Sequence, residues 1–407
     1  HIRLWNSRQL FRPLPPESIP QSQHHNRRTC SLTSLDRRQC WYVFEQSTEI
    51  HPAPKTNHLT VPLPDIRSNA VDIIKWAGLE PAIRAAGTNE KGMQFVQSDG
   101  SPIATLQATG RTDMQSMTSE QDGEKVTVTF ARSQKVESFD LLVGADGYYS
   151  KIRGAMLGAK PADQVFGEGV HVAYFTIKRD LLAGSLLAKG HNATGGRSLV
   201  LRPDPSPAGR TRGMFINANW ASNTAAKERL DKALRAGEEA YKDLMEEMFA
   251  DAGWLAPEIL RGMRDSDDFY CSVFAQTRSP KLQDGRVVLL GDAGHAMPGQ
   301  GTSLAITGAY ILAGEMLRSP EEIATATKRY EALMLPFVQK QQAGDVQFAM
   351  QLANPETWWG IAIRNMVLRI VIGSGLVDLV MRASAWLGYS EAKVDLPEYP
   401  WPVIEKQ

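Results

Sequence analysis

Asp292 supplies the carboxylate of a glycine-rich turn formed by residues 291–301. An apolar run at 286–290 precedes this turn and a helix-like run at 302–317 follows it, which predicts a buried strand, a tight turn and a helix. Backbone N–H groups at a helix N-terminus can bind phosphate or another electron-rich oxygen, and glycines let a ligand come close. A carboxylate there would repel a pyrophosphate but suits a sugar hydroxyl. The turn therefore predicts a site for a polyhydroxylated, phosphorylated ligand.

A second strand-like run enters a similar turn upstream. Asp146 lies between Gly144 and Gly147, and Arg153 follows on what should be the next helix. The glycines again permit close approach of a ligand to the backbone. Because both turns carry one carboxylate among glycines, we expect them to face one shared cleft and to bind one ligand.

Together the two turns resemble the GD and DG motifs of the group A flavoprotein monooxygenases, the aromatic-hydroxylase-like FAD enzymes. The two motifs occur in the family's order and far apart in the chain. The resemblance spans Pro64 to Pro336. Within the family, the chain resembles most the subgroup of tetracycline-modifying and fungal secondary-metabolite hydroxylases.

The resemblance implies a cofactor role for each motif. In the family the GD aspartate, here Asp292, binds the ribityl chain of FAD, and the segment at Pro298 lies along the flavin ring. The DG turn is associated with both FAD and NAD(P)H. The cofactor-binding residues implied in this chain are Gly144, Asp146, Gly147, Arg153, Gly291, Asp292, Pro298, Gly299 and Gly301.

The implied activity is an NAD(P)H-using, FAD-dependent monooxygenation. NAD(P)H reduces FAD, O2 adds at flavin C4a, and the hydroperoxide transfers one oxygen atom to a small aromatic or polyketide-like substrate. The sequence shows no Ser/His/Asp nucleophile pattern, P-loop or paired-carboxylate spacing. This fits a reaction in which the cofactor carries the difficult chemistry.

The sequence identifies no catalytic side chain, because the flavin would carry the chemistry. His295 is a weak candidate for a general base, and a structural or flavin-adjacent role fits its place in the turn better. Arg67 could reach the flavin or the substrate, although a solvated arginine at a helix start is the commoner case. Phe175, Met214 and Phe215 are candidates for the substrate cavity, with plain sheet core as an equal alternative.

The chain departs from the family pattern in two places. It contains no G-x-G-x-x-G phosphate loop, and its first glycine is Gly78. It also lacks the arginine-bearing segment that the family places before residues 121–124. A strand at 40–45 ends in Glu45, which resembles the acid that binds the adenosine ribose, while an exposed loop acid is an equal alternative.

The predicted fold class is α/β: a Rossmann-like FAD-binding domain with an incomplete N-terminal βαβ unit, a second β-sheet substrate domain and C-terminal helices. The predicted divisions are an irregular and possibly aberrant segment at 1–60, FAD-binding parts at 61–165 and 281–335, a substrate-binding sheet at 166–280 and a helical region at 336–407.

Periodicity predicts the individual elements. Helices are expected at 69–86, 227–250, 302–317 and from 327 onward, including 330–342. Strands are expected at 125–130, 170–177 and 269–274, with hairpins pairing 95–96 with 103–106 and 198–201 with 213–216. The apolar run 360–388 contains charged residues, so a packed helix pair broken at 373–375 is expected in place of a membrane span.

Composition excludes other classes of protein. Lys and Arg number 45 and Asp and Glu number 45, so the chain lacks the basic excess of a nucleic-acid binder. Its three cysteines are too few and too scattered for a disulfide framework, and no His or Cys cluster has metal-ligand spacing. No signal peptide is visible, which predicts a cytoplasmic protein, with membrane-surface association a minor alternative.

Three alternatives stay open. The chain could be a defective or mis-translated relative that no longer binds FAD, since both departures remove cofactor contacts. It could keep FAD but act as a reductase or halogenase, although residues 358–361 do not match the W-x-W-x-I motif of halogenases. A scaffold that uses its Trp-rich C-terminus would leave both glycine turns unexplained.

Overall fold

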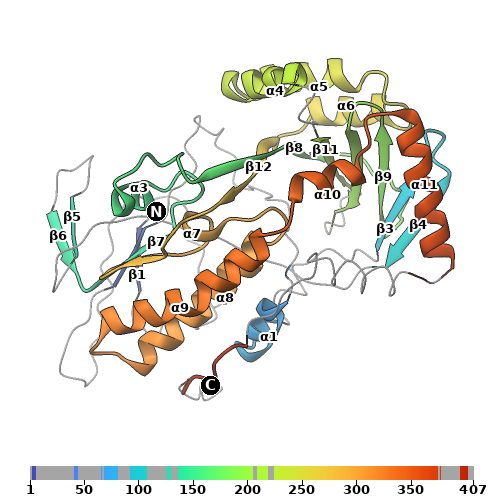
Figure 1. Cartoon of the computed structure of the whole chain (residues 1–407). Helices are drawn as coiled ribbons and strands as arrows, with labels where there is room; N and C mark the ends of the chain where they lie inside the picture. The colour runs from blue at the N-terminus through green and yellow to red at the C-terminus, as the bar shows by residue number, and fades with distance from the viewer. Residues whose placement is uncertain are drawn as a thin grey trace.

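The structure is a computed structural model that describes residues 2–5, 41–44, 66, 68–80, 92–107, 126–129, 136–204, 209–218, 224–374, 376 and 395–401. Its strands form a five-stranded sheet, a seven-stranded sheet and a two-stranded ribbon. Helices cover both larger sheets, so the mixed α/β architecture agrees with the predicted fold class (Figure 1).

The five-stranded sheet has the order β1-β2-β7-β14-β13. Its three central strands, β2 (Trp41–Phe44), β7 (Leu141–Gly144) and β14 (Val287–Leu289), run parallel to one another. All residues of β7 and β14 are buried, as expected for parallel strands covered on both faces. The edge strands β1 (Ile2–Trp5) and β13 (Gln283–Asp284) are antiparallel to their neighbours. The apolar run at 40–45 thus forms a strand as predicted, whereas periodicity did not predict β1.

The seven-stranded sheet has the order β12-β8-β11-β10-β9-β3-β4. Its antiparallel centre consists of β8 (Val165–Ile177), β9 (Leu187–Ala193), β10 (Arg197–Pro203), β11 (Thr211–Ala218) and β12 (Tyr270–Thr277). The predicted hairpin of β3 (Gly92–Val96) and β4 (Pro102–Gln107) joins this sheet through a parallel pairing of β3 with β9. It does so although it comes from the stretch 61–165, so local pattern did not indicate which sheet it joins. The domain boundaries as a whole stay a prediction.

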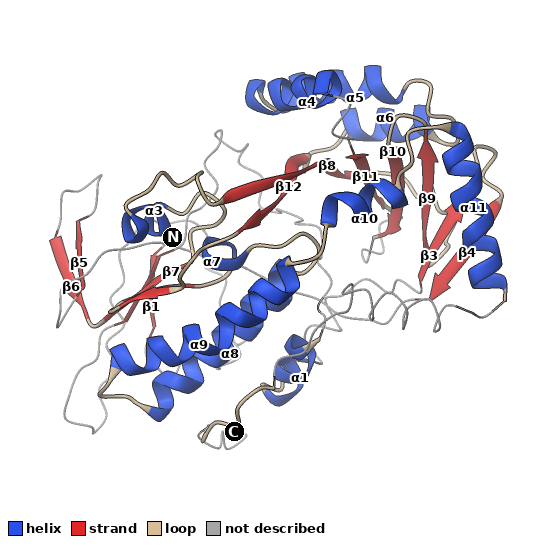
Figure 2. Ribbon diagram, viewed as in Figure 1, coloured by secondary structure: helices blue, strands red, loops and turns tan. Residues whose placement is uncertain are grey.

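Helices α4 (Thr224–Ala236), α5 (Glu238–Phe249) and α6 (Ala256–Arg264) lie over one face of the seven-stranded sheet (Figure 2). Their buried side chains form one core with the sheet, in which the Phe215 and Phe249 rings lie 4.4 Å apart. The prediction of a single helix at 227–250 is wrong. Gly237 interrupts it with φ 109° and ψ −177°, a conformation that glycine adopts readily.

A second core joins the five-stranded sheet to helices α8 (Gly301–Arg318) and α9 (Ile323–Gln342). Helix α1 (Asn69–Trp76) packs against α8. The C-terminal residues 395–401 return to α8, where the Tyr310 hydroxyl donates to the Pro397 carbonyl at 3.1 Å. The ribbon of β5 (Val126–Thr129) and β6 (Val136–Phe139) leads into β7, and α3 (Lys151–Leu157) follows it.

Helices α10 (Val346–Ala353) and α11 (Trp358–Gly373) end the described helical region. Helix α11 ends at the predicted break, and the second helix of the expected pair lies outside the described residues. Within the described part of the chain, no helix has the length and apolarity needed to cross a membrane. Glu45 and Arg67 also lie outside the described residues, so their predicted roles stay predictions.

Candidate cofactor site

The two glycine turns lie side by side because the strands that lead into them are parallel neighbours. Val288 is paired with Val143 and Leu289 with Gly144, so both strands end at the same edge of the sheet. The Leu290 N–H donates to the Gly144 carbonyl at 2.7 Å, where the two turns begin. Carboxyl ends of parallel strands are the usual place for ligands in open α/β sheets.

Asp292 begins the short helix α7 (Asp292–His295), which stands between β14 and α8. Gly291 precedes it with φ 64°, a conformation that residues with a Cβ rarely adopt. A Cβ on Gly301 would lie 3.1 Å from Asp292 Oδ1, so the glycine at the start of α8 leaves room beside the carboxylate. Asp292 is partly exposed, and its desolvation raises the pKa of its carboxyl to about 6.

Asp146, in the other turn, contacts the N-terminus of α3, whose N-cap residue is Ser150. Its Oδ2 accepts a hydrogen bond from the Lys151 N–H at 2.6 Å, and Ser150 Oγ accepts one from the Arg153 N–H at 2.9 Å. Asp146 Oδ1 is buried and has no hydrogen-bond partner among the described residues. Burial is the main reason that the pKa of this carboxyl is raised to about 7.

Arg153 connects the two turns. Its fully buried guanidinium donates to the Ala293 carbonyl at 2.5 Å, to the Tyr148 carbonyl at 2.5 Å and to the Pro161 carbonyl at 2.6 Å. Ala293 belongs to the Asp292 turn and Tyr148 to the Asp146 turn. Arg153 therefore fixes the spacing between the two turns, and its predicted direct contact with a cofactor stays a prediction.

His295 is fully buried and faces the protein interior. Its Nε2 lies 3.5 Å from the Tyr330 hydroxyl, which donates to the Leu289 carbonyl at 2.8 Å. Burial lowers the pKa of His295 to about 4, so the imidazole is neutral at neutral pH. These surroundings favour the structural role over general-base catalysis.

The sequence did not indicate the residues that hold the Asp292 turn from β12 and α9. Thr277, at the end of β12, donates from its Oγ1 to the Asp292 carbonyl at 2.8 Å. Gln342, at the end of α9, donates to the carbonyls of Thr277 and Ala296 at 2.8 and 3.1 Å. These contacts join segments far apart in the chain, and no local pattern of residues could have predicted them.

A row of aromatic residues on the seven-stranded sheet lies next to the same turns. Tyr174 of β8 is paired with Met214 and with Tyr270, and the two tyrosine rings stack 6.4 Å apart. Burial raises the pKa of Tyr148, in the Asp146 turn, and the nearby Asp292, Tyr270 and Tyr174 add to this shift. Met214 thus shares a face with these tyrosines, as a cavity residue would.

Phe175 and Phe215 have a different environment. Both are buried in the core beneath the α4–α6 layer, with their rings 5.2 Å apart. They therefore match the sheet-core alternative and not the cavity alternative.

Comparison with known proteins finds relatives that are similar over most of the chain. No protein-family model matches it. It is 29% identical to Monooxygenase CTB7 of Cercospora beticola, over 82% of this chain and 88% of that protein. It is 27% identical to the FAD-dependent monooxygenase asL4 of Sarocladium schorii, over 86% of this chain and 91% of that protein.

Two solved structures of other proteins have a fold similar to that of this chain. The tetracycline destructase Tet(51) superposes with a TM-score of 0.60 at 24% identity, covering 83% of this chain and 89% of that one. HpxO of Klebsiella pneumoniae, in complex with FAD and uric acid, superposes with a TM-score of 0.60 at 20% identity, covering 80% and 87%.

Proposed function

The chain belongs to the group A flavin-dependent monooxygenases, and we propose that it uses NAD(P)H, FAD and O2 to hydroxylate a small aromatic or polyketide-like molecule. The observation that carries this proposal is the meeting of the Asp292 and Asp146 turns at one sheet edge. Action in secondary metabolism and a cytoplasmic location are part of the proposal.

The residues at this edge fit the part of FAD that the GD and DG motifs serve. Asp292 is a carboxylate with room beside it at Gly301, as acceptance from ribityl hydroxyls requires. Asp146 Oδ1 is a buried acceptor without a partner, and the residues before α8 supply backbone N–H groups at a helix N-terminus. The printed sequence holds no G-x-G-x-x-G loop for the pyrophosphate, so the fit is limited to these two turns.

The protein's own part is to bind and to orient. Asp292 would hold the sugar-like chain, Arg153 would fix the distance between the two turns, and the neutral His295 would pack beneath them. Bound FAD supplies the hydride acceptance and the O2 activation that no side chain can provide.

We place the substrate over the sheet face that carries Tyr174, Met214 and Tyr270. Their cross-strand pairing makes a mostly apolar surface with polar hydroxyl tips, and an aromatic ring can stack on such a surface. Tyr148 is near both this surface and the Asp292 turn, since Asp292, Tyr270 and Tyr174 add to the burial that raises its pKa. An aromatic substrate therefore fits this face better than a highly charged one.

The test is a turnover assay with added FAD, NADH or NADPH, and isotopically heavy O2. With a panel of phenols and polyketides, we expect faster oxidation of the reduced nicotinamide in the presence of a substrate, and one heavy oxygen atom in the product. Nicotinamide oxidation that never labels a product across the panel would favour the reductase alternative. A halide-dependent product would favour a halogenase.

Asp292→Ala tests the site itself. A charge-assisted hydrogen bond contributes about 1.5–3 kcal/mol, so its loss should weaken FAD binding roughly 10- to 100-fold. Quenching of FAD fluorescence in a titration measures this affinity. The exposed-surface variant Asp267→Asn, whose carboxylate pairs with Lys178, is the matched control and should bind as the parent does. If Asp292→Ala and the parent bind FAD with equal affinity, Asp292 does not contact the cofactor.

A further inference from the structure

Helix α11 turns its apolar side outward. Several large side chains on one face are about half exposed or more: Trp358 74%, Trp359 55%, Ile363 51%, Met366 54%, Val367 47% and Ile370 56%. At 3.6 residues per turn these positions share one face. None of the residues of α11 is fully buried. A helix on the surface of a soluble protein normally shows the opposite arrangement.

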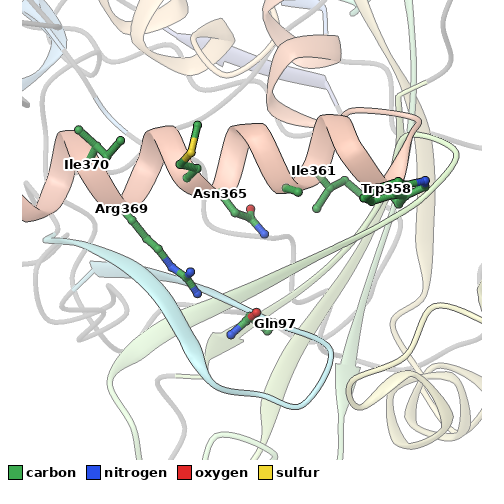
Figure 3. Close-up of a pocket in the computed structure, with 8 residues that line it drawn as sticks. Gln97, Trp358, Ile361, Asn365, Arg369 and Ile370 are labelled. Atoms are coloured by element: carbon green, nitrogen blue, oxygen red, sulfur yellow. The ribbon is translucent and has the colours of Figure 1, made fainter.

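The side of α11 that faces the protein carries its polar residues. The helix packs against the edge strand β4 and against β9, and the Arg364 guanidinium lies 5.6 Å from the centre of the Phe95 ring. Figure 3 shows Asn365 and Arg369 pointing toward the β3–β4 hairpin, with Ile370 on the other side of the helix. Burial lowers the pKa of Arg364 to about 10. Arg364 and Asn365 thus lie on the side of the helix that faces the protein, whereas its most exposed large apolar side chains lie on the outside.

A groove runs along this contact. It has a volume of about 500 Å³ and lies between α11 and Gln97, with Trp358 at one end and Arg369 and Ile370 at the other. Arg369 is exposed at its mouth. Helix α11, which forms one wall of the groove, lies at the outer edge of the seven-stranded sheet, away from α7 (Figure 1). The exposed face and the groove therefore do not belong to the proposed cofactor site.

We propose that the outward face of α11 docks the protein on an anionic lipid surface. The 16 residues of α11 include no Asp or Glu, and Arg369, which is exposed and lines the groove beside the outward-facing Met366 and Ile370, supplies a positive charge for anionic headgroups. Tryptophans favour the boundary between headgroups and acyl chains, and two of them begin this helix. At 1.5 Å per residue the helix is about 24 Å long, shorter than a hydrocarbon core of about 30 Å, so it would lie on the surface.

The experiment is co-sedimentation of the full chain with vesicles of phosphatidylcholine alone and with added phosphatidylserine. It needs neither FAD nor turnover, so its failure and the failure of the proposed monooxygenase activity are distinguishable. We expect stronger binding to the vesicles that contain phosphatidylserine. Ile363→Asp should weaken this binding at least about tenfold, because a charge replaces an inserted apolar group. Ile363→Leu should keep it.

Arg369→Glu tests the charge contribution separately. Each basic residue near an anionic surface strengthens binding about fivefold, so this reversal should weaken binding about tenfold or more and only to the vesicles with phosphatidylserine. Arg229→Glu, an equal reversal on the distant α4, is the matched control and should leave binding within about twofold.

Three results would overturn the proposal. The first is no pelleting with either vesicle, and the second is unchanged binding by Ile363→Asp. The third is a parent protein that sediments as a dimer without binding lipid and becomes monomeric with Ile363→Asp, which would assign the face to a second copy of the chain. Circular dichroism spectra that match the parent's would confirm that each variant is folded.

Discussion

At the residue scale, the two aspartates of the site are held in environments that oppose their charge. Asp146 is the clearer case, because desolvation of its side chain outweighs the hydrogen bonds from α3 that favour the ionised form. Asp292 is shifted in the same direction by desolvation alone. Carboxylates with raised pKa values at a ligand-binding edge are typical of functional sites.

The raised pKa of Asp146 predicts a pH-dependent stability. The folded protein releases the Asp146 proton at about pH 7, whereas the ordinary value is 3.8. Between these values the folded state binds more protons than the unfolded state, so the free energy of unfolding falls as the pH rises. Asp146 therefore contributes full stability below its ordinary pKa, and this contribution is lost as the pH rises through the folded value.

Asp146→Asn isolates this effect, because an amide oxygen can still accept from the Lys151 N–H but does not titrate. We expect urea unfolding of the cofactor-free parent to lose stability relative to this variant by at most about 1.4 kcal/mol per pH unit across this window. The exposed Asp267→Asn serves as control and should follow the parent. Parallel pH profiles of the parent and Asp146→Asn would show that burial does not raise this pKa.

At the element scale, local patterns predicted the two turns, but long-range contacts fix their positions relative to each other. The sequence indicated both strand–turn–helix units, because glycines, a carboxylate and an apolar strand follow one another within a few residues. It did not indicate that Arg153 would donate to Ala293, a partner 140 positions away. Nor did it indicate which sheet the β3–β4 hairpin joins, because strand alternation defines a strand and not its neighbour.

Arg153→Met tests the connection between the turns. The substitution removes three hydrogen bonds and leaves three carbonyls to find other partners, so we expect a loss of about 3 kcal/mol or more in the free energy of unfolding. Arg229→Met removes an exposed ion pair with Glu247 and should cost less than about 1 kcal/mol. Equal costs for the two variants in urea titrations would contradict the structural role of Arg153.

Gly237 explains why the helix predicted at 227–250 is two helices. The apolar spacing is helical on both sides, and only the backbone conformation of Gly237 separates α4 from α5. A lone glycine also occurs inside continuous helices, so the sequence left both outcomes open. The same ambiguity does not arise at Gly291, where an apolar strand precedes the glycine.

Gly237→Ala should destabilise the protein by roughly 1–3 kcal/mol, because its φ of 109° is strained for a residue with a Cβ. Gly373→Ala is the matched control at the end of α11, where a Cβ would meet nothing within 4 Å. It should be neutral or stabilising by up to about 1 kcal/mol. Thermal melts of the two variants should therefore shift in different directions or by clearly different amounts, and a shared small shift would mean that α4 and α5 can form one helix.

At the scale of the whole molecule, similarity to FAD-dependent enzymes predicts FAD binding, whereas this sequence lacks one of the elements that usually bind FAD. A relative over most of the chain, asL4, is named an FAD-dependent monooxygenase. The sequence nevertheless contains no G-x-G-x-x-G loop, the element that places pyrophosphate at a helix N-terminus. The two turns at the sheet edge would then have to bind the cofactor largely through its ribityl and ring parts.

We therefore expect the protein, as printed, to bind FAD weakly. Each charge-assisted hydrogen bond to the pyrophosphate contributes about 1.5–3 kcal/mol, so losing two or three would weaken binding by several powers of ten. Purified protein should carry less than one flavin per chain, and flavin should be taken up only at high FAD concentration. A variant with a grafted G-x-G-x-x-G loop ahead of β2 should bind FAD more tightly, and Asp292→Ala in that background should weaken it again. Purification of the parent with a full, tightly held complement of yellow flavin would mean that other residues bind the pyrophosphate in place of the missing loop.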